Sequence, residues 1–153
     1  MQKVTIEPFK VIGIAVRTSN QNGQAAQEIP ALWNQFMTTG VAEKIPNKTG
    51  SEIYSIYTNY EGDHMQPYDT VLAMQVSSLN DIPEGMVGHA FDGGTYQEFP
   101  AKGDLTQGVV YDCWLKIWDE ELDRTYTADF EVYGEKAQNP NDAELSIFVA
   151  VNA

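Results

Sequence analysis

The chain has 153 residues, the length of one ordinary domain with a single hydrophobic core. Its 42% hydrophobic content is typical of a soluble globular protein, and no run of about 18 apolar residues exists that could cross a bilayer as a helix. Its 22 acidic and 9 basic residues give a net charge of −13. This charge disfavours direct contact with a nucleic acid backbone.

The polar motifs exclude several kinds of site. The single cysteine, Cys113, rules out an internal disulfide and fits a reducing compartment. The N-terminal residues begin a strand pattern directly, so we expect no signal peptide and a cytoplasmic location. Neither His64 nor His89 has a partner at metal-ligand spacing, and no phosphate-binding loop or nucleophile motif occurs. We therefore expect no metal, no cofactor and no conventional catalytic residue.

The first half of the chain predicts strands on either side of one helix. Residues 3–17 have a strand pattern that is broken near Pro8. Apolar residues at helical spacing follow, and Gly40 is a plausible cap for the end of this helix. Pro30 lies either in the first turn or inside a helix that begins near Gln24. The remaining segments are predicted as a loop at 41–51, a strand at 53–60, a turn at 61–64 and a strand at 68–76.

The second half predicts the same order of elements. Asp92, Gly93 and Gly94 form a turn signal typical of a β-hairpin between two strands. The segments are predicted as strands at 86–91 and 96–99, a helix at 105–120, and strands at 126–133 and 145–151.

The two halves can be aligned with each other. A constant offset of 81 positions places Gly13 on Gly94 and Trp33 on Trp114. We therefore predict a single α+β domain over residues 1–153, with pseudo-repeats at about 1–80 and 86–153. Two repeated strand–helix–strand units would form one curved antiparallel sheet with two helices on one face.

An acidic residue in the strand at 128–134 is the main candidate for function. Strand alternation sends Phe130 and Val132 to one side, and Asp129, Glu131 and Tyr133 to the other. An acid well inside a sheet is costly unless a cation, a donor or a ligand meets it. Glu131 is our candidate for that acid. The alternative is that Glu131 lies on a solvated face of the sheet.

The aromatic residues suggest what such an acid could bind. Trp33, Trp114 and Trp118 fall on the two helices, where core packing is the alternative role. Tyr54, Tyr68 and Tyr96 fall on strands, where each hydroxyl requires a partner or water. A carboxylate among such rings suits a flat organic cation, because the rings offer stacking and cation–π attraction.

Several stretches together resemble a known family. They are IPALWNQF at 29–36, GGTYQEF at 93–99, the helical segment 110–118, DFEVY at 129–133 and the closing strand at 144–151. In their order and spacing they resemble the GyrI-like effector-binding domain, which is also the ligand-sensing half of multidrug-responsive transcription activators. The resemblance covers nearly the whole chain.

The resemblance implies a cleft between the two repeated units. In drug-binding relatives the acid of the Phe-Glu strand meets a cationic ligand at the floor of the cleft, which implies this role for Glu131. Tyrosines line the same cleft in relatives, which implies Tyr54, Tyr96 and Tyr68. Trp33 and Trp114 match helix positions of the family, while Asp119-Glu120-Glu121 departs from the apolar Leu-Pro of many relatives.

Three hypotheses follow from the residues and the resemblance. We favour a stand-alone binding module for an amphipathic, cationic aromatic small molecule, bound by Glu131, Tyr96, Tyr54, Tyr68, Trp33, Trp114 and Trp118. The second hypothesis is a hydrolase of reactive electrophiles in which Glu131 acts as general base, assisted by Tyr96 or Tyr133. The third is an inhibitory protein-interaction module. No helix-turn-helix pattern is present, so regulation of transcription would require a separate protein partner.

Overall fold

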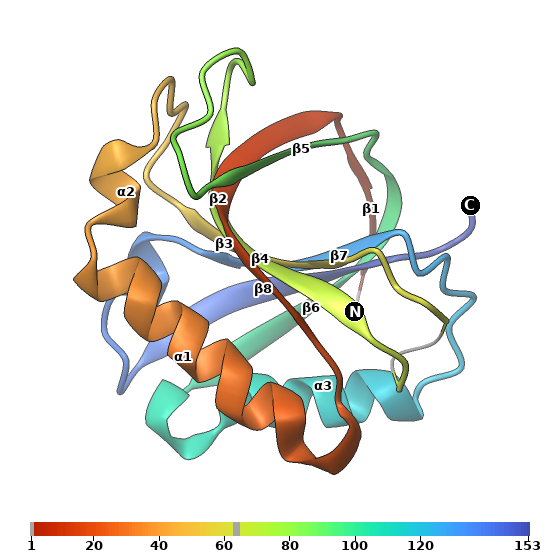
Figure 1. The fold of residues 1–153 in the computed structure, drawn as a ribbon. Helices are drawn as coiled ribbons and strands as arrows, with labels where there is room; N and C mark the ends of the chain where they lie inside the picture. The colour runs from red at the N-terminus through yellow and green to blue at the C-terminus, as the bar shows by residue number, and fades with distance from the viewer. Residues whose placement is uncertain (1, 63–64) are drawn as a thin grey trace.

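The computed structural model describes residues 2–62 and 65–153, so the predicted turn at 61–64 lies partly outside the described residues. The helices are α1 (Gln24–Thr38), the single-turn α2 (Val41–Lys44) and α3 (Val109–Asp119) (Figure 1). Short 3₁₀ turns lie at Gln21–Gly23, Leu105–Gln107 and Glu135–Ala137. The helix α1 begins at Gln24 and contains Pro30, whereas α2 falls within the segment predicted as a loop.

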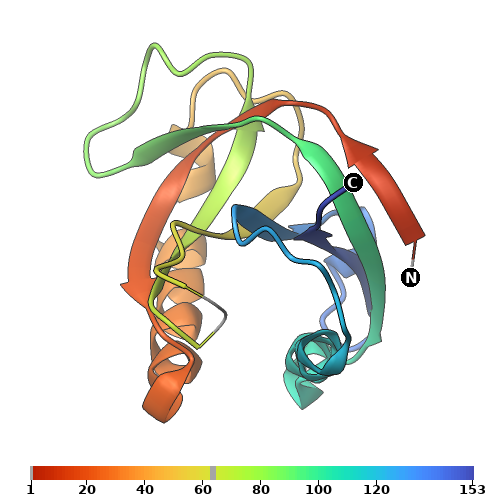
Figure 2. The ribbon, with the colours of Figure 1, turned by 90° about the vertical axis from the view of Figure 1, so that its right-hand side faces the viewer.

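The strands form one antiparallel sheet, as the sequence predicts. They are β1 (Gln2–Ile6), β2 (Phe9–Thr18), β3 (Ile53–Thr58), β4 (Tyr68–Val76), β5 (Val87–Phe91), β6 (Gly94–Gly103), β7 (Ala128–Tyr133) and β8 (Ala143–Ala150). Their order in the sheet is β1-β6-β8-β7-β3-β4-β2-β5. The order is symmetric about the β7–β3 pair, because each half contributes the same elements in the same relative places. Figure 2 shows the strong curvature of this sheet.

The predicted hairpin at Asp92-Gly93-Gly94 is wrong. The strand β5 pairs with β2, whereas β6 pairs with β1 and β8, so the three residues form a corner between the two halves of the sheet. Gly93 has a φ of 74°, and a Cβ atom at this position would lie 2.1 Å from the carbonyl oxygen of Ile6. Only glycine fits such a left-handed and crowded position, which explains why a hairpin and a corner share the same sequence signal.

Cross-strand register shows that α1 and α3 cover the same face of the sheet. The residues Leu72, Ser55, Glu131 and Ile147 lie in one row across β4, β3, β7 and β8. Leu72 packs in the cluster that contains Leu32 and Phe36 of α1, and Ile147 packs in the cluster that contains Trp114 and Ile117 of α3. The row that contains Glu131 therefore lies under both helices, which we call the helix face.

The opposite face carries its own aromatic core. One row on that face runs through Val71, Ile56, Phe130 and Phe148, and the next row runs through Ala73, Tyr54, Val132 and Ser146. Phe9, Tyr96 and Phe130 are buried together there. None of the helices in the described part of the chain is long and apolar enough to span a membrane.

Candidate functional site

Glu131 is a buried carboxylate held by neutral donors. Its side chain lies on the helix face of β7, and the residue is 1% exposed. The Tyr57 hydroxyl and the Trp114 Nε1–H each donate to Oε2 at 2.7 Å, and the Tyr133 hydroxyl donates to Oε1 at 2.5 Å. These donors come from β3, α3 and β7, so the site joins the two halves of the domain. Hydrogen bonds to a charged acceptor are stronger than neutral ones, and they partly replace the water that burial removes.

A second buried acid on β7 shows what Glu131 lacks. The Asp129 side chain is 0% exposed and forms an ion pair with Arg124 at 2.7 Å. Asp129 also accepts hydrogen bonds from the Tyr60 hydroxyl at 2.6 Å and from the Ala150 backbone N–H at 2.7 Å. Within residues 2–62 and 65–153, no basic side chain forms an ion pair with Glu131. Asp129 is thus neutralised within the protein, whereas Glu131 is hydrogen-bonded without being neutralised.

Burial controls the protonation of this site. It raises the pKa of Glu131, and the hydrogen bonds from Tyr133, Trp114 and Tyr57 offset only part of that shift. Burial, followed by the nearby carboxylate, also raises the pKa of Tyr57 and of Tyr133 well above the ordinary tyrosine value. Both hydroxyls therefore remain protonated donors near neutral pH.

The raised pKa predicts a pH-dependent stability difference between the wild type and Glu131→Gln. The folded protein prefers the neutral acid, so the ionised form costs stability at neutral pH, and this cost disappears as the pH falls through the raised pKa. Gln can accept from Trp114 and Tyr57 through its carbonyl oxygen and donate to the Tyr133 oxygen. We expect the free energy of unfolding of the wild type to rise relative to that of the variant on acidification. Urea unfolding at several pH values measures this difference, and parallel pH profiles would contradict the assignment.

Aromatic rings surround the carboxylate on the helix face. The Tyr57 ring makes edge contacts with Trp114, with ring centroids 5.6 Å apart, and with Tyr68 at 5.8 Å. Trp33 of α1 contacts the Tyr133 ring at 4.9 Å. This last contact links α1 to the residues that hold Glu131.

Four of the predicted site residues lie with Glu131 on the helix face. Trp114 donates to it directly, and Trp33 and Tyr68 pack on its two tyrosine donors. Trp118 lies beside Trp114, with ring centroids 6.2 Å apart. The Tyr68 hydroxyl itself donates to Asn20 Oδ1 at 2.6 Å, so Tyr68 contributes its ring rather than its hydroxyl to the surroundings of the carboxylate.

The prediction that Tyr54 and Tyr96 share a cleft with Glu131 is wrong. Tyr54 pairs with Val132, so it points to the opposite face, where its ring lies 5.8 Å from Phe130. The Tyr96 ring lies 5.3 Å from the same phenylalanine. Neighbouring residues of a strand face opposite sides, so both tyrosines are separated from Glu131 by the sheet.

Sequence patterns did not single out Tyr57. They place Tyr133 on the same side of the strand as Glu131, but assign it only the part of an assistant in the hydrolase hypothesis. Tyr133 was detectable, because it alternates with Glu131 on β7 and therefore lies on the same face. Tyr57 was detectable only with the register, because its face follows from the pairing of Ser55 with Glu131. Within the described part of the chain, no group of three or more His, Cys, Asp or Glu side chains could hold a metal ion, and His64 lies outside it.

Comparisons with known proteins point to effector binding. The chain matches, over residues 4–151, the family model described as integron-associated effector binding protein. It is 28% identical over 153 residues to the putative transcriptional regulator protein YobU of Bacillus subtilis (strain 168), with 91% of this chain and 89% of that protein covered.

Solved structures with the same fold include two of particular interest. The integron cassette protein VCH_CASS2 from the mobile metagenome of Vibrio cholerae is 30% identical, with a TM-score of 0.78 over 99% of this chain and 95% of that chain. SAV2435 bound to tetraphenylphosphonium is 18% identical, with a TM-score of 0.78 over 99% of this chain and 93% of that chain. At that identity the second likeness concerns the fold alone.

Proposed function

The chain belongs to the family of integron-associated effector-binding proteins, and from this premise we propose that the Glu131 site binds a hydrophobic organic cation. The observation that carries the proposal is the buried carboxylate of Glu131, which accepts three hydrogen bonds from neutral donors. A cation placed beside it would stabilise the ionised form that burial disfavours. The neighbouring rings would add cation–π attraction of about 0.5–2 kcal/mol each.

The chemistry of one relative supports this class of ligand. SAV2435, which shares the fold, binds tetraphenylphosphonium, a lipophilic cation with four aromatic rings. The charge of such an ion is spread over apolar groups, so it loses less hydration energy on burial than a small ammonium ion. In this chain the rings of Trp33, Tyr57 and Trp114 offer the matching aromatic surface.

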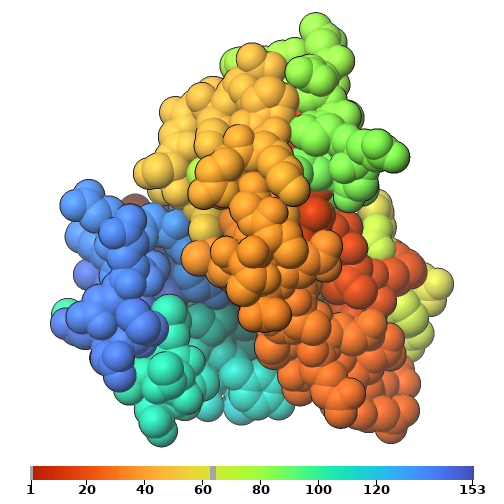
Figure 3. All heavy atoms as spheres, turned by 60° about the vertical axis from the view of Figure 1, so that its left-hand side comes forward, coloured from red at the N-terminus to blue at the C-terminus, as the bar shows by residue number. Residues whose placement is uncertain are grey.

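Ligand binding at this site requires side chains to move. Glu131 is 1% exposed, so a ligand reaches the carboxylate only after the rings above it separate. The contact between Trp33 and Tyr133 is one that must open, because it joins α1 to the site. Figure 3 shows α1 along the surface next to the teal segment that contains α3. We infer that the ligand enters between these two helices.

Calorimetric titration with tetraphenylphosphonium tests the proposal. We expect Glu131→Gln to weaken binding of the cation by about 1–3 kcal/mol, because the substitution removes the charge and keeps the hydrogen bonds. Triphenylphosphine oxide is a neutral analogue with similar rings, and the substitution should change the affinity for it only slightly. The wild type should bind the cation more tightly as the pH rises through the raised pKa of Glu131, because the proton must leave first.

Matched controls separate the alternatives. Arg124→Met/Asp129→Asn removes the other acid of β7 together with the cation that neutralises it, so the net charge near the site is unchanged and the selectivity for the cation should be unchanged. Equal losses for both ligands in Glu131→Gln would show that the carboxylate has only a structural role. Consumption of a reactive electrophile by the wild type but not by the variant would favour the hydrolase hypothesis instead.

The family and the net charge of the protein together suggest how ligand binding could affect regulation. The related protein YobU is a putative transcriptional regulator. The net charge of −13 opposes direct contact with DNA, so we propose that any regulatory output passes through another protein.

A further inference from the structure

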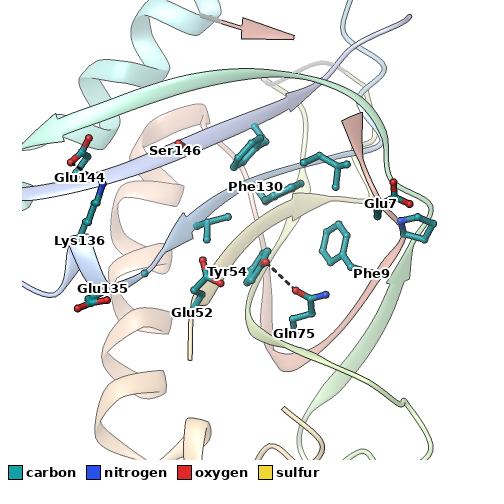
Figure 4. Close-up of a pocket in the computed structure, with 15 residues that line it drawn as sticks. Glu7, Phe9, Glu52, Tyr54, Gln75, Phe130, Glu135, Lys136, Glu144 and Ser146 are labelled. Atoms are coloured by element: carbon teal, nitrogen blue, oxygen red, sulfur yellow. Dashed lines mark hydrogen bonds and ion pairs between the residues drawn. The ribbon is translucent and has the colours of Figure 1, made fainter. Parts of the chain in front are cut away.

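A second cavity lies on the opposite side of the sheet from Glu131. Its volume is about 600 Å³, which is within the range of small-molecule pockets. Phe130 lines it, as Figure 4 shows, and so does Val132 of the same strand. Glu131, between them in the sequence, points to the helix face, where Trp114 of α3 donates to it. We call this cavity the β7 groove. It is separate from the proposed Glu131 site, because the sheet lies between them.

The floor of the β7 groove is aromatic. The Phe130 ring lies 5.3 Å from Phe9, 5.8 Å from Tyr54 and 5.0 Å from Phe148. Tyr54, Val132 and Phe148 are only partly buried, so apolar surface of the floor faces the cavity. Apolar surface in contact with water is unfavourable, so an apolar ligand that covers this floor would gain binding free energy.

Acidic side chains gather at one end of the groove, and a single acid, Glu7, lies at the other end. Glu52, Glu135 and Glu144 line the first of these ends together with Lys136, as Figure 4 shows. Lys136 forms a long ion pair with Glu144 at 4.0 Å, and in the described part of the chain neither Glu52 nor Glu135 forms an ion pair. The Cγ and Oε2 atoms of Glu52 lie 3.5 Å from the place that a Cβ of Gly134 would take, so the Glu52 carboxylate is close to the end of β7. An apolar floor therefore ends at an uncompensated negative charge.

We propose that the β7 groove is a second binding site, for an amphipathic molecule with an aromatic or aliphatic body and an ammonium head. The body lies over Phe9, Phe130 and Phe148, and the head lies between Glu52 and Glu135. Unlike the Glu131 site, the groove requires no ring to open. The attraction to the head is a surface interaction, so it weakens as salt increases.

A titration of the full chain followed by amide NMR tests the groove. The protein carries Glu131→Gln, so that the charge of the first site is absent. The probes are 6-phenylhexyltrimethylammonium and the neutral 6-phenylhexanol. We expect both probes to cause saturable changes in the amide chemical shifts of the groove-lining residues in β3, β7 and β8. The ammonium ion should bind more tightly than the alcohol. An absence of saturable shifts there would overturn the proposal, whatever happens at the Glu131 site.

Charge reversal tests the role of the acidic end. The double variant Glu52→Lys/Glu135→Lys should bind the ammonium probe about fivefold more weakly than its parent at low salt. Its affinity for the alcohol should stay within about twofold of the parent's. Both side chains are exposed, and unchanged thermal unfolding would verify that the fold is intact. The matched control Glu120→Lys/Glu121→Lys makes the same charge change after α3, outside the groove, and should have a smaller effect. Equal losses in the two double variants would overturn the placement of the head.

Discussion

Arg124→Met should destabilise the protein by about 3–5 kcal/mol, because it leaves the buried carboxylate of Asp129 without its cation. The Arg124 side chain is 6% exposed and that of Asp129 is 0% exposed, and they form an ion pair at 2.7 Å. The guanidinium also lies over the Tyr126 ring, 4.3 Å from its centroid. Met retains much of the apolar volume of Arg, so the loss would report the charge rather than a cavity. Urea unfolding measures it.

A second substitution isolates the electrostatic part of this loss. In the background of Arg124→Met, Asp129→Asn removes the unpaired charge and keeps an oxygen that can accept from the Ala150 N–H or the Tyr60 hydroxyl. We expect the double variant to recover more than half of the lost stability. A loss below about 1 kcal/mol in the single variant would mean that water reaches Asp129 and that the pair is not buried in solution.

The two acids of β7 thus have different roles although the sequence presents them alike. Alternation places Asp129 and Glu131 on one side of the strand, as predicted. The difference arises from Arg124, which belongs to the segment before β7, beyond the reach of strand periodicity. Strand alternation could identify costly acids in the sheet, but it does not separate Glu131 from Asp129, and of the sequence observations only the family resemblance favours Glu131 over Asp129.

Much of the fold was predictable because its elements have strong local signals. Residues 68–76 were predicted as a strand, and these are the bounds of β4. The α+β class and the resemblance to GyrI-like effector-binding domains are confirmed by the antiparallel sheet and by the family match over residues 4–151. The corner at Gly93 was not predictable, because positive φ is required equally by a hairpin turn.

The errors in the site have a common cause. Each strand pattern gives two faces, but it does not indicate which face of β3 or β6 is shared with Glu131. The pairing of Ser55 with Glu131 sends Tyr57 to the carboxylate and Tyr54 to the groove. A shift of one residue in this register would have exchanged these faces, so the family motif alone could not assign Tyr54 or Tyr96.

Phe130→Ala should destabilise the protein by about 3–5 kcal/mol, because the ring joins the buried core to the floor of the β7 groove. Phe130 is 2% exposed, and its ring packs against the rings of Phe9, Tyr96 and Phe148 at 5.0–5.3 Å. Urea unfolding measures the loss.

The control is Val132→Ala, two residues further along the same face. Val132 is only partly buried and lines the groove, so its truncation should cost about 1 kcal/mol or less. Equal losses for the two variants would show that the packing does not differ along this face. A large difference would mean that Phe130, and not Val132, holds β7 in the core. Val132 could then contact a ligand on one side of the strand, and Glu131 could contact another ligand on the opposite side.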